Sequence, residues 1–89
     1  MAIIKKELIV KNKQGLHARP AALFVQVANK FNAYITVKRD SEEVNGKSIM
    51  GILMLGAEKG SVIIVEANGE DAEAALVELE KVISSEEEL

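Results

Sequence analysis

The chain of 89 residues contains no cysteine and no tryptophan, and it has a single proline and a single histidine. Without cysteine it can form neither a disulfide nor a thiolate metal site, which excludes a disulfide-stapled extracellular domain. Its aromatic residues are Phe24, Phe31 and Tyr34, too few for a row of rings on which nucleic-acid bases could stack. The core must therefore be built from aliphatic side chains and methionine.

An excess of charge of one sign is also missing. Eleven lysines and arginines stand against 14 aspartates and glutamates, for a formal net charge of -3, which opposes a general attraction to nucleic acid or anionic membranes. No apolar run reaches membrane-spanning length, and MAIIKKELIV is interrupted by two lysines, unlike the apolar core of a signal peptide. We expect a cytoplasmic protein with no membrane insertion and no direct contact with nucleic acid.

Apolar periodicity and turn residues predict the element order β-α-β-β-α-β-α. The predicted elements are a strand ending near residue 11, a helix over 18–31, a hairpin over 33–39 and 40–46, a helix over 47–56, a strand over 61–67 and a helix with its apolar face over 72–83. Residues 84–89 should fray. We expect one domain, 1–89, of the α+β class: an open-faced sandwich in which three helices cover one face of a four-stranded, mostly antiparallel sheet.

The only histidine lies in GLHARPAALF, residues 15–24, three positions before the only proline. This spacing places His17 at or just before the start of the first helix, where backbone N–H groups and the helix dipole favour an anion. Arg19 adds a guanidinium that can hold phosphate oxygens. The same field favours the neutral imidazole, which is the nucleophilic form. The segment suits phosphorylation of His17, although a lone loop histidine is more often a solvated polar residue.

The segment GLHARPAALF resembles the active-site segment of the HPr family, the histidine-containing phosphocarriers of the phosphoenolpyruvate-dependent sugar phosphotransferase system. NGKSIMGILMLGAEKG resembles the second motif of that family, so the resemblance covers nearly the whole chain and implies an HPr-like fold. It implies that His17 accepts a phosphoryl group from enzyme I, on Nδ1, and passes it to IIA domains of sugar permeases. Arg19 and the backbone N–H groups of Ala18 and Arg19 would stabilise the phosphoryl charge. Such a protein is a covalently phosphorylated carrier rather than an independent enzyme, with no cofactor and no metal.

Ser48 precedes an apolar run and is a candidate helix N-cap. The KSIMG context resembles Gram-positive-type HPr, which implies phosphorylation of this serine by an HPr kinase/phosphorylase and binding of the phosphoserine form to a catabolite-repression transcription regulator. A two-turn helix on a sheet buries only about half of its circumference, so an apolar patch should stay exposed. If the two helix starts lie close together, this patch rings His17. The expected partner-binding residues are Leu16, Lys47, Ile49, Met50 and Leu53.

Two other functions remain open. An HPr-like module that acts only as a regulator, through the Ser48 surface, would have the same fold, and some relatives of that kind lack the histidine. A small α+β RNA-binding domain is disfavoured by the acidic balance and the missing ring platform. The presence of His17 beside Arg19 and Pro20 favours the phosphocarrier.

Overall fold

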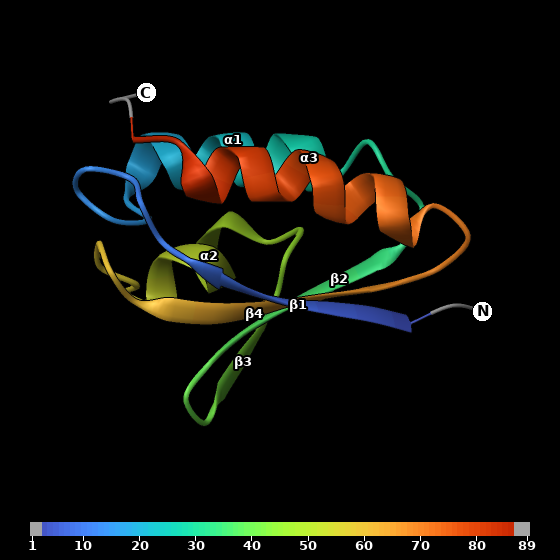
Figure 1. Cartoon of the computed structure of the whole chain (residues 1–89), viewed down its shortest axis with the longest axis horizontal. Coiled ribbons are helices and arrows are strands. Elements are labelled where there is room, and N and C mark those ends of the chain that lie inside the picture. The colour runs from blue at the N-terminus through green and yellow to red at the C-terminus, as the bar shows by residue number, and fades with distance from the viewer. Residues whose placement is uncertain (1–2, 87–89) are drawn as a thin grey trace.

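The computed structural model describes residues 3–86, whose four strands form one sheet in the order β1-β4-β2-β3 (Figure 1). The strands are β1 (Ile3–Ile9), β2 (Tyr34–Arg39), β3 (Glu42–Asn45) and β4 (Val62–Asn68). The helices are α1 (Ala18–Ala28), α2 (Ile49–Met54) and α3 (Ala72–Ser84). Every neighbouring pair of strands is antiparallel. The predicted fold class and element order are confirmed.

Strict alternation of side chains makes the sheet one-sided. In β4, Ile63, Val65 and Ala67 are buried while the residues between them are partly exposed. Because successive side chains of a strand point to opposite faces, these three residues turn one face of the sheet toward the helices. Figure 1 shows α1 and α3 side by side over that face. The other face is open and carries the ion pairs of Lys38 with Glu43 and Glu66.

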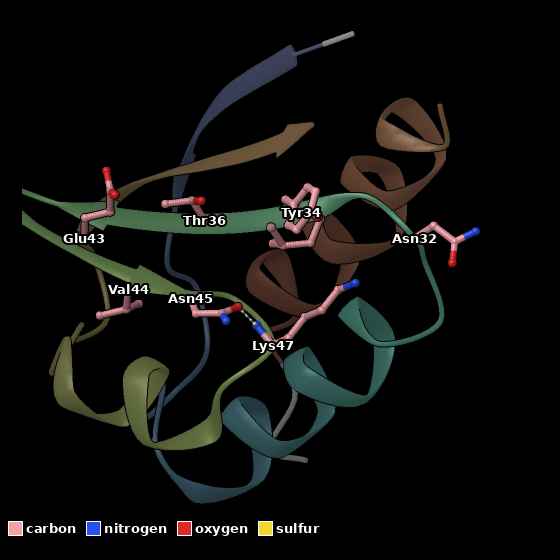
Figure 2. A pocket seen from close by; sticks show the side chains of 8 residues that line it. Asn32, Tyr34, Thr36, Glu43, Val44, Asn45 and Lys47 are labelled. Carbon is pink, nitrogen blue, oxygen red and sulfur yellow. Dashed lines mark hydrogen bonds between the residues drawn. The ribbon is translucent and has the colours of Figure 1, made fainter. Parts of the chain in front are cut away.

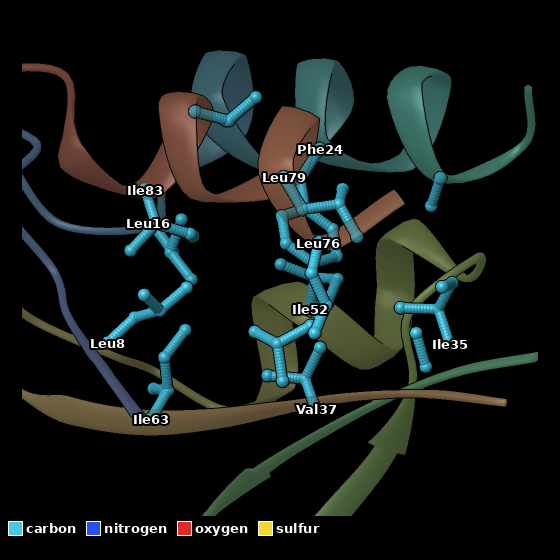
Figure 3. Packing of buried hydrophobic residues seen from close by; sticks show 14 of the residues in the cluster. Leu8, Leu16, Phe24, Ile35, Val37, Ile52, Ile63, Leu76, Leu79 and Ile83 are labelled. Carbon is cyan, nitrogen blue, oxygen red and sulfur yellow. The ribbon is translucent and has the colours of Figure 1, made fainter. Parts of the chain in front are cut away.

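The core fills the space between the helices and the sheet (Figure 3). Phe24 of α1, Ile52 of α2 and Leu79 of α3 are fully buried together with Val37 and Ile63 of the sheet. Burying an aliphatic side chain of this size contributes about 1.5 to 3 kcal/mol. Each helix is therefore held in place mainly by its apolar stripe, and the predicted apolar face of the last helix is buried as expected.

Helix α1 ends at Ala28, three residues before the predicted end at Phe31. The side-chain amide of Asn29 donates to the carbonyl oxygen of Val25 at 2.9 Å, and the chain then leaves the helix. The carboxylate of Asp71 accepts the backbone N–H groups of Asn32 and Ala33 at 2.8 and 2.9 Å. These long-range bonds draw the segment toward β2, so the helical spacing of Phe31 is overridden by a tertiary contact.

Helix α2 begins where the sequence predicts. The hydroxyl oxygen of Ser48 accepts the backbone N–H of Gly51 at 3.2 Å, which makes Ser48 the N-cap. The chain leaves the helix through Gly56, whose φ of +57° lies in the left-handed region that favours glycine. Ser84 is the last residue of α3, and the predicted fraying of the tail concerns in part residues 87–89, which lie outside the described residues. None of the helices within 3–86 has the length and apolar character needed to cross a membrane.

Candidate functional site

His17 is the N-cap residue of α1, as the sequence predicts. Its backbone is extended, with φ of -91° and ψ of -164°, and its carbonyl oxygen accepts the N–H of Ala21 at 2.9 Å. The side chain makes no capping hydrogen bond and is half-buried. The backbone of His17 therefore starts the helix, while the imidazole is not engaged in capping it.

The first turn of α1 continues with Ala18, Arg19 and Pro20. Ala18 and Arg19 are exposed and hold the first two backbone N–H groups of the helix, whereas Pro20 has no N–H and is buried against the core. The positive end of a helix favours an anion at such a position. His17, the exposed Arg19 and the first N–H groups are thus gathered within one turn, as the expected phosphate site requires.

The segment before His17 is pressed against the connection between α2 and β4. The backbone N–H of Leu16 donates to the carbonyl oxygen of Ala57 at 2.9 Å. Gly15 has a φ of +76°, and a Cβ atom at this position would lie only 2.5 Å from the same oxygen. Glycine is required here on both grounds. The position of His17 is therefore set by a contact between residues about 40 positions apart.

Asn12 anchors the other side of this segment, and the sequence offers no signal for that role beyond a polar turn. It is the buried polar residue of the core, 1% exposed. Its side-chain amide donates to the carbonyl oxygens of Val82 at 2.9 Å and Ser85 at 3.2 Å, where α3 ends. The backbone N–H of Lys11 donates to Ile83 at 3.0 Å. The end of α3 thus helps to hold the loop that carries His17.

A surface hollow of about 300 Å³ lies beside the imidazole. It is lined on one side by Gln14, Leu16 and His17. The other side is formed by residues from the end of α2 and the turn that follows it, namely Leu53, Gly56, Ala57 and Glu58. A group attached to the imidazole would therefore meet both segments. Glu58 falls within the second motif, which assigns it no role.

The end of α2 lines the hollow beside His17, whereas its start, where the expected partner surface begins, does not. The hollow beside His17 includes Leu53 and Gly56, at the end of α2. At the other end of α2, the amine of Lys47 donates to the carbonyl oxygen of Phe31, just after α1, at 2.6 Å. The start of α1 therefore shares this hollow with the end of α2, whereas Ser48 stands at the other end of α2.

Leu16 does not belong to the expected partner surface. It is only 4% exposed and packs in the core, because the hydrogen bond of its N–H to Ala57 turns this part of the chain inward. The other apolar candidates are exposed on α2: Ile49, Met50 and Leu53. Met54, 70% exposed, extends this patch beyond the expected partner residues. We call these four residues the α2 patch.

Larger hollows lie at the far end of the sheet, away from His17. One of them, of about 520 Å³, is lined mainly by polar side chains of β2 and β3 around Tyr34 (Figure 2). A second, of about 390 Å³, lies on the other side of Tyr34 beside Asp71. Neither hollow includes His17. Among residues 3–86, no three His, Cys, Asp or Glu side chains gather closely enough to hold a metal ion.

Outside the hollow beside His17, hydrogen bonds that involve carboxylates shift two pKa values, those of Asp71 and Lys38. The N–H groups of Asn32 and Ala33 stabilise the ionised carboxylate of Asp71 and hold its pKa below the ordinary value. On the open face, the hydrogen bond to Glu66 raises the pKa of Lys38. Asp71 lies in the turn before α3 and Lys38 lies in β2, and neither of them lines the hollow beside His17.

Comparison with known proteins identifies relatives over nearly the whole chain. A family model described as "PTS HPr component phosphorylation site" matches residues 4–85. The phosphocarrier protein HPr of Xylella fastidiosa strain 9a5c is 43% identical over 83 residues, which cover 93% of either chain. The crystal structure of HPr from Bacillus anthracis shares 48% identity with a TM-score of 0.89 and covers 93% of this chain and 99% of that one. The solution structure of Crh, the Bacillus subtilis catabolite repression HPr, shares 40% identity with a TM-score of 0.71 and covers 94% of this chain and all of that one.

Proposed function

Because the chain belongs to the HPr family of phosphocarriers, we propose that it carries a phosphoryl group on His17 in the sugar phosphotransferase system. The donor is phosphorylated enzyme I and the acceptors are IIA domains of sugar permeases. The whole chain serves as one carrier domain in the cytoplasm. This proposal extends the family assignment to a named residue and to named partners.

The observation that carries the proposal is the position of His17. Its half-buried side chain lies at the N-terminal end of α1, and the exposed Arg19 is the second residue of that helix. The helix dipole and the guanidinium stabilise the negative charge of a phosphoryl group at this point, which is the main task of a phosphoryl-transfer site.

The transfer balances without a cofactor. A lone pair on an imidazole nitrogen of His17 forms the new P–N bond, while the P–N bond of the donor phosphohistidine breaks and its electron pair returns to the donor nitrogen. No proton has to be exchanged, because each imidazole keeps the proton on its other nitrogen. The same step in reverse passes the group to a IIA domain. The residues of this chain orient the ring and stabilise the phosphoryl oxygens.

The test is phosphorylation with enzyme I and phosphoenolpyruvate. We expect one acid-labile phosphate per chain, because a phosphoramidate hydrolyses in acid, and we expect His17→Ala to take up none. Arg19→Ala should slow the transfer by about 10² to 10³ if the guanidinium stabilises the transition state. Equal labelling of the His17→Ala variant would refute the assignment.

A second, regulatory function is favoured by the accessibility of Ser48 and by the similarity to Crh, described as a catabolite repression HPr. Ser48 is half-buried at the start of α2, next to the exposed Ile49 and Met50. We propose that an HPr kinase/phosphorylase phosphorylates Ser48 and that the phosphoserine form binds a transcription regulator. With the cognate kinase and ATP, we expect an acid-stable phosphate that is lost in Ser48→Ala. Absence of label in the parent protein would confine Ser48 to its capping role.

The α2 patch is the proposed docking surface for these partners. Its exposed methionines, Met50 and Met54, suit partners of different shape because the side chain is flexible and polarisable. Leu53 belongs both to the patch and to the lining of the hollow beside His17. A partner seated on the patch would thus reach the imidazole. Lys47 adds positive charge at the start of α2, although its amine is also bound to Phe31. With this protein as the substrate of enzyme I, a Met50→Lys substitution should raise the KM more than it lowers the kcat of phosphorylation.

A further inference from the structure

The hollow beside His17 is lined by a carboxylate to which neither sequence motif assigns a role. Within residues 3–86, Glu58 is the only acidic residue that lines this hollow, and it is exposed. It takes part in none of the ion pairs found within residues 3–86. The hollow therefore presents a negative charge on the side opposite the start of α1.

The backbone around Glu58 is held tightly against the site. Gly15 lies two residues before His17, and a Cβ atom on Gly15 would lie 2.9 Å from the Cα atom of Glu58. The carbonyl oxygen of Glu58 accepts the N–H of Ser61 at 2.9 Å, and the N–H of Gly60 donates to Val10 at 2.8 Å. The turn that carries Glu58 is thus bonded on both sides, which keeps the backbone of Glu58 beside the hollow.

We propose that Glu58 sets the phosphoryl-transfer potential of His17, an inference that rests on the proposed function. A phosphoryl group on His17 adds a charge of about -1.5 to -2. Arg19 and the start of α1 attract that charge, whereas the carboxylate of Glu58 repels it across the hollow. The phosphorylated state is stabilised enough to form and destabilised enough to pass the group on. Glu58 acts on the phosphoryl group through space and is not a nucleophile.

The other charged groups close to His17 or Glu58 in sequence are cationic. Arg19 lies on the same helix as His17 and acts in the opposite sense to Glu58. Lys13 and Lys59 are exposed neighbours in sequence of Gln14 and Glu58 but do not line the hollow. Because charges at a protein surface interact only weakly through water, we expect a change of about two- to tenfold in the phosphorylation equilibrium when Glu58 loses its charge.

The experiment measures the fraction of phosphorylated protein at equilibrium with enzyme I, with pyruvate in large excess over phosphoenolpyruvate. Glu58→Gln should raise the equilibrium constant for phosphorylation about two- to tenfold, because it removes the repulsion while keeping the size of the side chain. Glu58→Asp keeps the charge and should stay close to the parent value. In 1 M KCl, where the Debye length is about 3 Å, the difference should shrink.

The matched control is Glu70→Gln, which makes the same change in net charge. Glu70 is exposed and lies beyond the far end of β4, so a general charge effect would appear in both variants and a local one only at Glu58. Circular dichroism verifies that each variant is folded. An equilibrium constant that stays unchanged in Glu58→Gln, or that rises equally in Glu70→Gln, overturns the inference. If the parent protein takes up no phosphate at all, the proposed function itself fails, which is a distinguishable outcome.

Discussion

The side-chain amide of Asn12 lies 2.9 Å from the carbonyl oxygen of Val82 and donates a hydrogen bond to it inside the core. This bond joins the loop that carries His17 to the end of α3, 70 residues away in sequence. Removing one partner of a buried hydrogen bond leaves the other without compensation for its lost hydration. The geometry of the site therefore depends on a helix that contributes no residue to the hollow beside His17.

Asn12→Ala should lower the free energy of unfolding by about 1 to 3 kcal/mol, because two carbonyl oxygens at the end of α3 lose their donor. Urea denaturation measures this loss. Asn29→Ala is the matched control, since the Asn29 amide donates to Val25 at the same 2.9 Å but in an exposed position. A smaller loss is expected for Asn29, and equal losses in the two variants would show that burial of the bond is not the cause.

Gly15→Ala should destabilise the protein more than Gly56→Ala. Both glycines have positive φ, +76° and +57°, so each substitution strains the backbone by about 1 to 2 kcal/mol. Only at Gly15 does the added Cβ atom also meet the carbonyl oxygen of Ala57, at 2.5 Å, whereas nothing lies within 4 Å at Gly56. Thermal and urea denaturation of the pair separate the clash from the backbone strain. Gly15→Ala should also slow phosphorylation of His17, and Gly56→Ala should do so less.

The ionised carboxylate of Asp71 should stabilise the folded protein, and this stabilisation should be lost as the pH falls below about 4. Its pKa is lowered in the folded state by the N–H groups of Asn32 and Ala33, so the unfolded chain binds its proton at higher pH than the folded one does. The stabilisation is complete above the ordinary value of 3.8 and is lost as the pH falls through the folded pKa.

Urea denaturation between pH 2 and pH 6 measures this dependence. Asp71→Asn should be less stable at neutral pH and should flatten the acid limb of the curve, because the amide carries no charge for the N–H groups to stabilise. Asp40→Asn, in the exposed turn between β2 and β3, serves as the control. If Asp71→Asn retains the full acid dependence, another carboxylate is responsible for it.

Ser48→Ala should lower the free energy of unfolding by about 1 kcal/mol, because the N–H of Gly51 loses its capping acceptor. Ser48→Asp should keep most of the stability, since an aspartate caps a helix about as well as a serine. Comparing the two variants by urea denaturation distinguishes capping from any regulatory role. Equal destabilisation by both substitutions would mean that the hydroxyl does not act as the cap.

Much of the fold follows from local patterns in the sequence. Alternating apolar residues in β4 and the helical spacing in α3 predict both elements, because each pattern is repeated over several turns or pleats. The position of His17 at the start of α1 follows from the spacing to Pro20. The exposed part of α2 follows from counting, since six residues of helix contain more apolar side chains than one face can bury.

The predictions that differ from the structure, those for Leu16, for the end of α1 and for the orientation of α2, share one cause. Leu16 is apolar and adjacent to His17, so sequence alone leaves open whether it faces a partner or the core. The end of α1 is decided by the bonds of Asp71, which is about 40 residues away. The direction of α2 relative to α1 depends on the path of the hairpin between them. Local periodicity determines which side of an element is apolar, but it says nothing about which ends of two elements meet.

The sequence by itself determined the elements, their order, and a histidine at a helix start with an arginine beside it, because spacing and composition act within a few residues. Only the tertiary structure decided that the end of α2, rather than its start, faces His17 and that Glu58 lies beside the imidazole. It also decided that Asn12 holds the site from the end of α3. These relationships arise because the packing of buried apolar faces brings distant segments of the chain into contact. No local sequence pattern specifies which of those segments meet.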